Sequence, residues 1–88
     1  STILEKTLMD TFYVDGACSV AGKTLSELDL RKKTGASIIA VIRRGEAKSN
    51  PTASFIIEDG DILVVLGSHA QLNGAIELLN RSCHLPEA

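Results

Sequence analysis

Aromatic residues are scarce in this 88-residue chain, which has one tyrosine, two phenylalanines and no tryptophan. A core must therefore come from Ile, Leu, Val and Ala, which is feasible because 44% of the residues are hydrophobic. No apolar run approaches the roughly 20 residues of a membrane-spanning helix, and no secretory signal is visible. The length suits one compact domain and not two.

Positive charge is also scarce, since the formal net charge is −2 and the basic residues are scattered apart from Arg31-Lys32-Lys33 and Arg43-Arg44. A general nucleic-acid binder needs a concentrated positive surface, so we expect no nucleic-acid partner. The chain starts at Ser1 without a methionine, and Pro86-Glu87-Ala88 resembles a loose end. We expect a domain excised from a longer protein.

Cysteine is limited to Cys18 and Cys83, which do not suggest a disulfide scaffold. We expect reduced thiols in a cytosolic domain, with a secreted, bonded pair as the alternative. Together with His69 and His84 the cysteines could in principle bind zinc, but no paired spacing supports this. Cys83 and His84 are adjacent, in a tail expected to fray. We therefore expect no metal site.

The hydrophobic pattern predicts an α+β fold with a small mixed β-sheet and two helices, in the order β-α-β-β-β-β-α. Thr24 with Glu27, and Ser68 with Gln71, match capping boxes at the helix starts. Gly35 suits the left-handed end of the first helix. An unbroken apolar run predicts that the second strand is buried on both faces. The strands are expected at residues 11–15, 36–42, 47–49, 54–57 and 61–66, and the helices after Thr24 and after Ser68.

Residues 16–24, GACSVAGKT, nearly match the phosphate-binding loop of nucleotide hydrolases. That loop needs G-x-x-x-x-G-K-[ST], because successive backbone N–H groups must curl around the phosphates. Counting back from Gly22, the first position holds Ala17, and Gly16 falls one residue too early. No acid for magnesium ends the ILVVL strand either. We expect Gly16 and Gly22 only to shape a loop.

Three carboxylates lie close together at Glu58, Asp59 and Asp61 and could hold a hard cation. The favoured interpretation is a turn whose acids stay solvated and whose glycine, Gly60, takes a positive φ. No nucleophile–base pair stands out in the chain. We therefore expect no catalytic residue, no cofactor and no enzymatic activity. The serines considered as nucleophiles are Ser19, Ser37 and Ser49.

The segment from Gly22 to Arg31 reads G-K-T-L-x-E-L-D-L-R, and ASIIAVIRRGE, Asn-Pro and FIIEDGDILVVLGS follow. This succession resembles the TrkA-C domain, the C-terminal RCK subdomain, from about Thr11 to Leu79. The resemblance implies a dimerising regulatory domain on the cytosolic side of potassium channels, Trk- and Ktr-type uptake systems and cation/proton antiporters. The domain is expected at residues 11–80, after a linker or preceding segment at 1–10 and before a C-terminal tail at 81–88.

In some members of this family, the dimer cleft binds cyclic di-adenosine monophosphate. The resemblance implies that Arg31 meets a phosphate, Ser37 donates a hydrogen bond, and Leu30 and Ile38 pack on a base. Lys32 replaces a usual Ala and either blocks the cleft or adds a favourable charge; Ser37 replaces a common Asn. The alternative is that these are ordinary surface and core positions. The six matching positions are Asp29, Leu30, Arg31, Ser37, Ile38 and Pro51.

The expected function is a regulatory and dimerisation module of a potassium or other cation transport protein, which biases gating through its dimer arrangement. The alternative is a small-molecule sensor for cyclic di-AMP or another anionic ligand; a phosphate-loop enzyme fragment is disfavoured. The expected partners are a second copy and a membrane-embedded transporter or channel part of the same or another chain. The expected location is the cytoplasm, at the cytosolic face of the membrane. The apolar dimer surface is expected from Val14, Ile39 or Val41.

Overall fold

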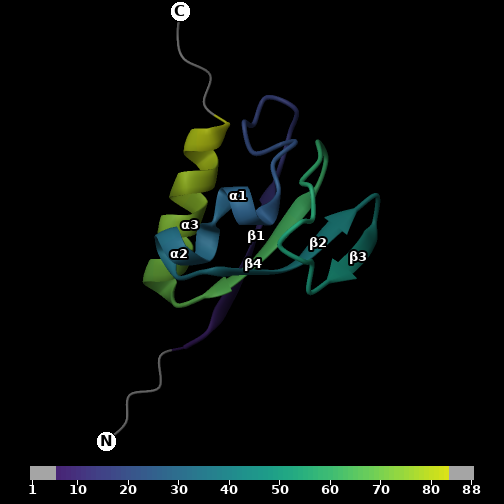
Figure 1. The fold of residues 1–88 in the computed structure, drawn as a ribbon. Helices are drawn as coiled ribbons and strands as arrows, with labels where there is room; N and C mark the ends of the chain where they lie inside the picture. Colours follow the sequence, from purple (N-terminus) through teal and green to yellow (C-terminus); the bar gives the residue numbers. More distant parts are fainter. Residues whose placement is uncertain (1–5, 84–88) are drawn as a thin grey trace, which may run out of the picture.

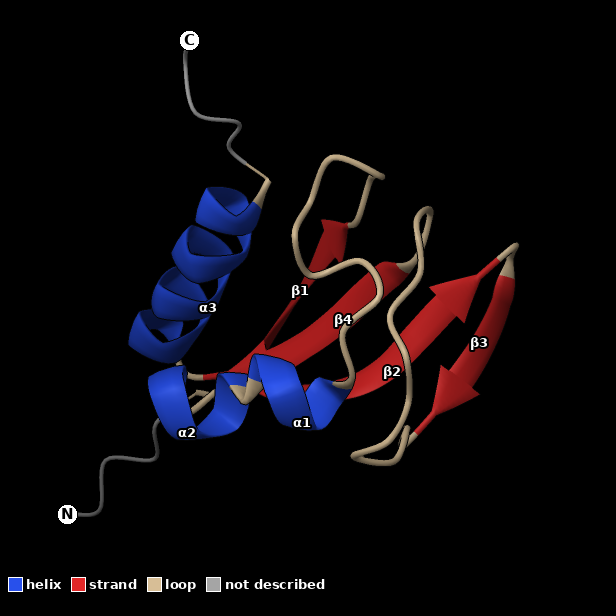
Figure 2. Ribbon diagram, turned by 45° about the horizontal axis from the view of Figure 1, so that its top comes forward, coloured by secondary structure: helices blue, strands red, loops and turns tan. Residues whose placement is uncertain are grey.

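The fold is an antiparallel sheet with all of its helices on one face (Figures 1 and 2). The computed structural model describes residues 6–83. Within these residues, no helix combines the length and apolar character needed to cross a membrane. The α+β class expected from the sequence is confirmed. The elements in chain order are β1 (Leu8–Tyr13), α1 (Leu25–Leu28), α2 (Leu30–Thr34), β2 (Ser37–Arg43), β3 (Glu46–Ser49), β4 (Ile62–Gly67) and α3 (His69–Ser82).

The four strands lie in the order β1-β4-β2-β3, and every pairing is antiparallel where a mixed sheet was expected. The first strand begins at Leu8, opposite Gly67, inside the segment expected to be a linker. The prediction of a strand at residues 54–57 is wrong. The backbone of these residues bonds instead to the loop before α1, where Ile57 N–H donates to Lys23 O at 2.8 Å, so this segment adds only an isolated bridge between Thr24 and Ile56.

The single helix expected after Thr24 is two short helices, because the chain turns at Asp29 (φ 50°, ψ 43°). The side chains of two residues that are two positions apart on one helix point to nearly opposite sides. The break allows both Leu28 and Leu30 to be buried, at 4% and 3% exposure. The capping boxes are confirmed, and Gly35 ends α2 in the left-handed region at φ 82°. A Cβ on Gly35 would lie 2.6 Å from Gln71 Nε2, so α2 ends directly against the start of α3.

The core lies between the sheet and the helices, where alternate strand residues meet the buried stripe of α3. The opposite face has no helix over it among residues 6–83, and Met9 and Tyr13 there are 63% and 59% exposed. On β2 only Val41 is fully buried, so the expectation of burial on both faces is wrong. Val14 and Val41 are inaccessible and cannot supply a dimer surface, whereas Ile39 is half-buried.

The two cysteines are bonded to each other, and the expectation of free thiols is wrong. The loop after β1 folds against the end of α3, where Ser19 N–H donates to Ser82 O at 2.7 Å. This brings Cys18 and Cys83 together across a sequence separation of 65. Cys83 is the C-terminal cap of α3 and packs against the core rather than lying in a frayed tail. His84, the other half of the zinc alternative, lies outside the described residues.

Candidate functional site

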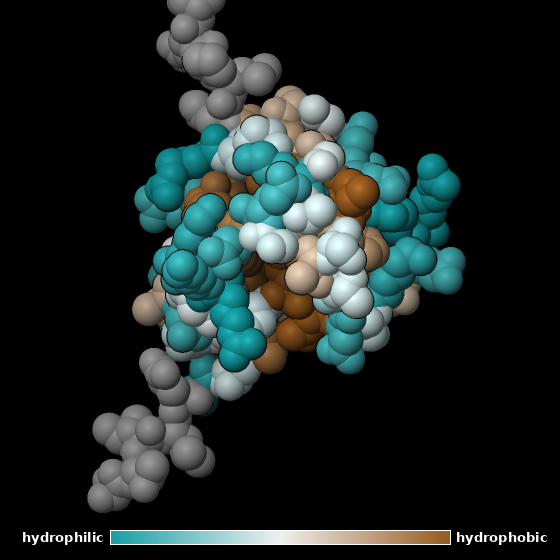
Figure 3. Space-filling model, viewed as in Figure 1, coloured by the Kyte–Doolittle hydropathy of each residue, from teal (hydrophilic) through white to brown (hydrophobic). Residues whose placement is uncertain are grey.

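A pocket of about 340 Å³ opens between the two short helices, the start of β2 and the loop after β3. The volume falls in the range typical of small-molecule sites. Figure 3 shows hydrophobic residues exposed in a hollow of this face, bordered by hydrophilic ones. The structure brings together all six positions named from the sequence. The pocket is lined by Leu25, Ser26, Asp29, Leu30, Arg31, Ser37, Ile38, Pro51 and Ala53.

Two charged residues line the pocket: Asp29, at the break between α1 and α2, and Arg31, in the first turn of α2. Arg31 is exposed, and within residues 6–83 its guanidinium forms no ion pair. A planar guanidinium in this setting can bind a phosphate through two hydrogen bonds. The carboxylate of Asp29 makes no capping bond to α2, so it can accept from a hydroxyl or amine of a ligand. The charged groups of the pocket are therefore one cation and one carboxylate, beside the hydroxyls of Ser26 and Ser37.

The apolar part of the pocket comes from Leu30, Ile38 and Pro51. Leu30 is buried, while Ile38 and Pro51 are partly exposed and can contact a flat, weakly polar ligand. Lys32 is exposed and does not line the pocket, so it does not fill the space available to a ligand. The arrangement combines apolar walls with a few converging polar groups, as small-molecule sites usually do.

Three lining residues, Leu25, Ser26 and Ala53, were not identified from the sequence as part of a site. The loop carrying Ala53 is joined to the first turn of α1 by two backbone bonds. Ser26 N–H donates to Ala53 O at 2.9 Å, and Leu25 N–H donates to Phe55 O at 3.0 Å. The sequence holds no local signal for this contact, because the loop and the helix lie far apart along the chain.

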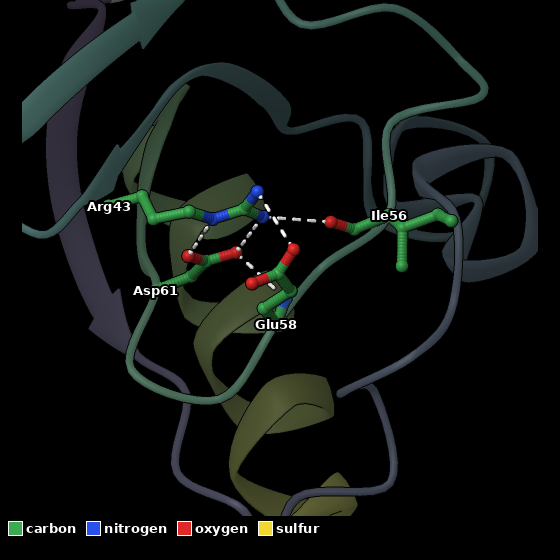
Figure 4. A network of polar contacts seen from close by, with 4 residues as sticks. All are labelled: Arg43, Ile56, Glu58 and Asp61. Atoms are coloured by element: carbon green, nitrogen blue, oxygen red, sulfur yellow. Dashed lines mark hydrogen bonds and ion pairs between the residues drawn. The ribbon is translucent and has the colours of Figure 1, made fainter.

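The same loop is anchored at its far end by Arg43, from the last position of β2 (Figure 4). Its Nε and Nη2 donate to the two carboxylate oxygens of Asp61, both at 2.8 Å. Nη2 also donates to Ile56 O at 2.9 Å, and Nη1 lies 3.0 Å from Glu58 Oε2. The guanidinium lies over the ring of Phe55, 4.8 Å from its centre. One side chain therefore binds four residues of the loop region.

Asp61 corrects the expectation that the turn acids stay solvated, because it is fully buried, although Gly60 has the expected positive φ of 90°. Burial alone would raise the pKa of Asp61. The hydrogen bonds from Arg43 and from Glu58 N–H, with the charge of Arg43, outweigh burial and hold that pKa below its usual value. The sequence did contain a signal for this burial. Asp61 lies two and four positions before the buried Leu63 and Val65, and residues at this spacing along a strand lie on the same face.

The glycine loop at residues 16–24 offers no cradle for phosphate. Gly22 N–H donates to Ile57 O at 2.7 Å, and Lys23 N–H donates to Val20 O at 3.1 Å. Because these N–H groups are already bonded within the chain, they cannot curl around a ligand. No group of three or more potential metal ligands occurs within residues 6–83.

The described residues form a small α+β domain with helices on one face of its sheet and a pocket beside them. The TrkA-C domain family matches residues 12–80, most of the chain, and the chain belongs to this family. The K(+)/H(+) antiporter subunit KhtT of Bacillus subtilis is 36% identical over 70 residues, 78% of this chain and 42% of KhtT. The Ktr system potassium uptake protein C of the same organism is 45% identical over 49 residues, 56% of this chain and 22% of that protein. The chain thus spans less than half the length of either relative.

Among solved structures, the RCK_C domain dimer of S. agalactiae BusR in complex with c-di-AMP is similar to this chain. Its TM-score is 0.73 at 25% sequence identity, and the match covers 83% of this chain and 96% of that one. This neighbour shares the α+β fold over nearly its whole length.

Proposed function

We propose that this domain is a cytosolic regulatory and dimerisation module of a potassium or other cation transport protein. It acts at the cytosolic face of the membrane by favouring one dimer arrangement over another, since only a difference in affinity between two arrangements can bias a gate. The observation that carries the proposal is membership of the TrkA-C family, with relatives named as an antiporter subunit and a potassium uptake protein.

The dimer is tested by sedimentation equilibrium at high micromolar protein. We expect a dimer, because the related RCK_C domain of BusR is described as one. A monomer at that concentration would remove the dimer from the proposal. Regulation is then tested on the full-length protein by measuring potassium flux in vesicles, with and without a substitution that abolishes the dimer. An unchanged flux would reject regulation through the dimer arrangement.

A second candidate function is binding of cyclic di-AMP or another anionic ligand, which the pocket favours specifically. The six positions Asp29, Leu30, Arg31, Ser37, Ile38 and Pro51 line one cavity. Arg31 supplies a cation for a phosphate, and the apolar walls suit a base. In this proposal the ligand is the signal that selects the dimer arrangement.

Calorimetry with cyclic di-AMP tests this candidate. We expect heat of binding for the parent domain and at least a tenfold weaker affinity for Arg31→Ala, the loss of about 1.4 kcal/mol that one charged hydrogen bond contributes. Lys48→Ala is the matched control, because Lys48 is exposed on β3 and lies outside the pocket. Absence of heat at high micromolar ligand would reject this ligand, whereas equal binding by Arg31→Ala would reject the assigned site.

A further inference from the structure

The Cys18–Cys83 bond is a chemical feature that the proposed function does not use. It joins the loop after β1 to the last turn of α3. Cys18 is 3% exposed, whereas Cys83 is partly exposed, so Cys83 is the more accessible of the two cysteines. The bond therefore lies at the border of the core and the surface.

Each sulfur also has an oxygen acceptor beside it. Cys18 Sγ lies 3.6 Å from Asp15 Oδ1, and Cys83 Sγ lies 3.4 Å from Leu79 O. A disulfide has no hydrogen to donate, so these oxygens can accept from the cysteines only after reduction, when each sulfur carries a proton. The backbone bond from Ser19 N–H to Ser82 O keeps the two segments adjacent without the disulfide. The surroundings thus accommodate the thiol form as well as the bonded form.

We propose that Cys18 and Cys83 form a reversible thiol–disulfide site whose redox state controls the order of the pocket wall. The co-reactant is a dithiol reductant or, in the reverse direction, a disulfide. Disulfides of cytosolic proteins are usually transient or redox-sensing, which agrees with the location proposed above.

The reaction balances as one two-electron exchange. A thiolate of the dithiol attacks Cys83 Sγ, forms a mixed disulfide and expels Cys18 as a thiolate, which takes a proton from water. The second thiolate of the reductant then attacks the reductant's first sulfur, the one bonded to Cys83 in the mixed disulfide. This releases the Cys83 thiolate, which is protonated in turn. The reductant leaves as a disulfide. The carboxylate of Asp15 disfavours negative charge on Cys18, so we expect the first step to be slow.

The loop connects this site to the pocket. It ends at Thr24, the N-terminal cap of α1, and α1 supplies the lining residues Leu25 and Ser26. Near that end it exchanges backbone bonds with Ile57 in the loop after β3 (residues 50–61), called the second loop below. Release of Cys18 from α3 removes the covalent anchor of the segment that carries the pocket wall.

The reaction is tested by incubating the domain in mixtures of reduced and oxidised dithiothreitol. Each mixture is quenched with acid and alkylated, and the products are identified by mass spectrometry. We expect both cysteines to be alkylated together at high reductant, full re-formation of the bond on removing reductant, and a helical circular dichroism spectrum in both states. Loss of the spectrum on reduction, or failure to re-form the bond, would show a structural link only and overturn the proposal.

Asp15→Asn sharpens this test, because the amide keeps an oxygen for Ala17 N–H but removes the charge beside Cys18. We expect the variant to be reduced several-fold faster than the parent domain. Asp10→Asn is the control, since Asp10 is exposed on β1 and accepts only from its neighbour Thr11 N–H among the described contacts. Equal rates for Asp15→Asn and the parent would contradict the chemistry assigned here.

Coupling to the pocket is measured without any ligand, so its result is separable from that of the proposed function. Hydrogen exchange at the Leu25 and Ser26 amides, which donate to the second loop, should become about tenfold faster on reduction. The amides of β4 should keep their relative protection after correction for global stability. Unchanged exchange at Leu25 and Ser26 would overturn the coupling to the pocket.

Discussion

The loop after β1 (residues 14–24) and the loop after β3 (residues 50–61) meet beside the pocket, yet different chemistry holds each one. A covalent bond joins the first loop to α3 through Cys18 and Cys83. Arg43 holds the second loop, through ionic and hydrogen bonds that centre on Asp61. A disulfide responds to redox conditions, whereas an ion pair between an arginine and a carboxylate responds to pH. We therefore expect the order of one pocket to respond to both redox conditions and pH.

The two loops also support each other. Gly22 N–H donates to Ile57 O at 2.7 Å, and Gly60 N–H donates to Val14 O at 2.6 Å. Neither loop is part of the four-stranded sheet, so these backbone bonds add to the disulfide and to Arg43 in holding the loops. Substitutions that release only one loop show how much order the other can supply alone.

The largest effect is expected from removing the covalent anchor. Replacing Cys18 and Cys83 by serine together should lower the free energy of unfolding by about 4 kcal/mol, because closing a loop of this length in the unfolded chain is worth that much. Urea unfolding followed by circular dichroism gives the value. A loss below about 1 kcal/mol, outside the range typical of native disulfides, would contradict a stabilising role for the bond.

Removing the ionic anchor should have the next largest effect. Arg43→Met leaves the fully buried Asp61 without its partner, and we expect a loss of about 3 kcal/mol in the same urea measurement. Arg81→Met is the matched control, since Arg81 also lies 2.8 Å from a carboxylate, that of Glu77, but both side chains are exposed. Its loss should be about 0.5 kcal/mol or less. Equal losses would show that burial of Asp61 does not decide the energetics.

Acid should release the second loop selectively. The pKa of Asp61 is lowered in the folded state, so its contribution to stability is present above the unfolded pKa of about 4 and is lost as the pH falls through the folded pKa. Urea midpoints between pH 5 and pH 2 should fall less steeply for Asp61→Asn than for the parent domain. Parallel curves would show that other carboxylates account for the acid sensitivity.

The smallest effect is expected at the junction of the two loops. Thr24 caps α1 and forms the isolated bridge with Ile56. Thr24→Ala should lower the unfolding free energy by about 1 kcal/mol, because Glu27 N–H loses its acceptor. Thr24→Ser keeps the hydroxyl and should restore most of the stability in the same assay. A serine variant as unstable as the alanine variant would assign the loss to the methyl group instead.

Local patterns predicted the features that depend on neighbouring residues. Both capping boxes and the left-handed Gly35 follow from short spacings. The resemblance, rather than the pattern, supplied the six positions that line one pocket.

The features that were missed depend on contacts between distant parts of the chain. The pairing of Cys18 with Cys83 requires a loop to reach the end of a helix 65 positions away. The expected strand at residues 54–57 has a suitable composition, but its hydrogen-bond partner is a loop. The break at Asp29 reflects the burial of two leucines that a single helix would place on opposite sides. Only the burial of Asp61 could have been predicted from the sequence, because its spacing from Leu63 and Val65 places it on the same face of the strand.

The close approach of Gly35 to Gln71 limits which sequences this domain can tolerate. The side chain of Gln71 fills the space between Gly35 and Gly67, where a Cβ would lie 2.6 Å and 3.1 Å, respectively, from its nearest atoms. Its Oε1 also accepts from Ser68 N–H, so moving the side chain aside breaks one of the two bonds of the capping box, while the bond from Gln71 N–H to Ser68 Oγ remains. Lys32, by contrast, is exposed and has no side-chain bond among the described contacts, so it tolerates exchange with little constraint. Residues 35, 67 and 71 are therefore coupled, because a larger residue at either glycine requires the Gln71 side chain at the start of the longest described helix to shift.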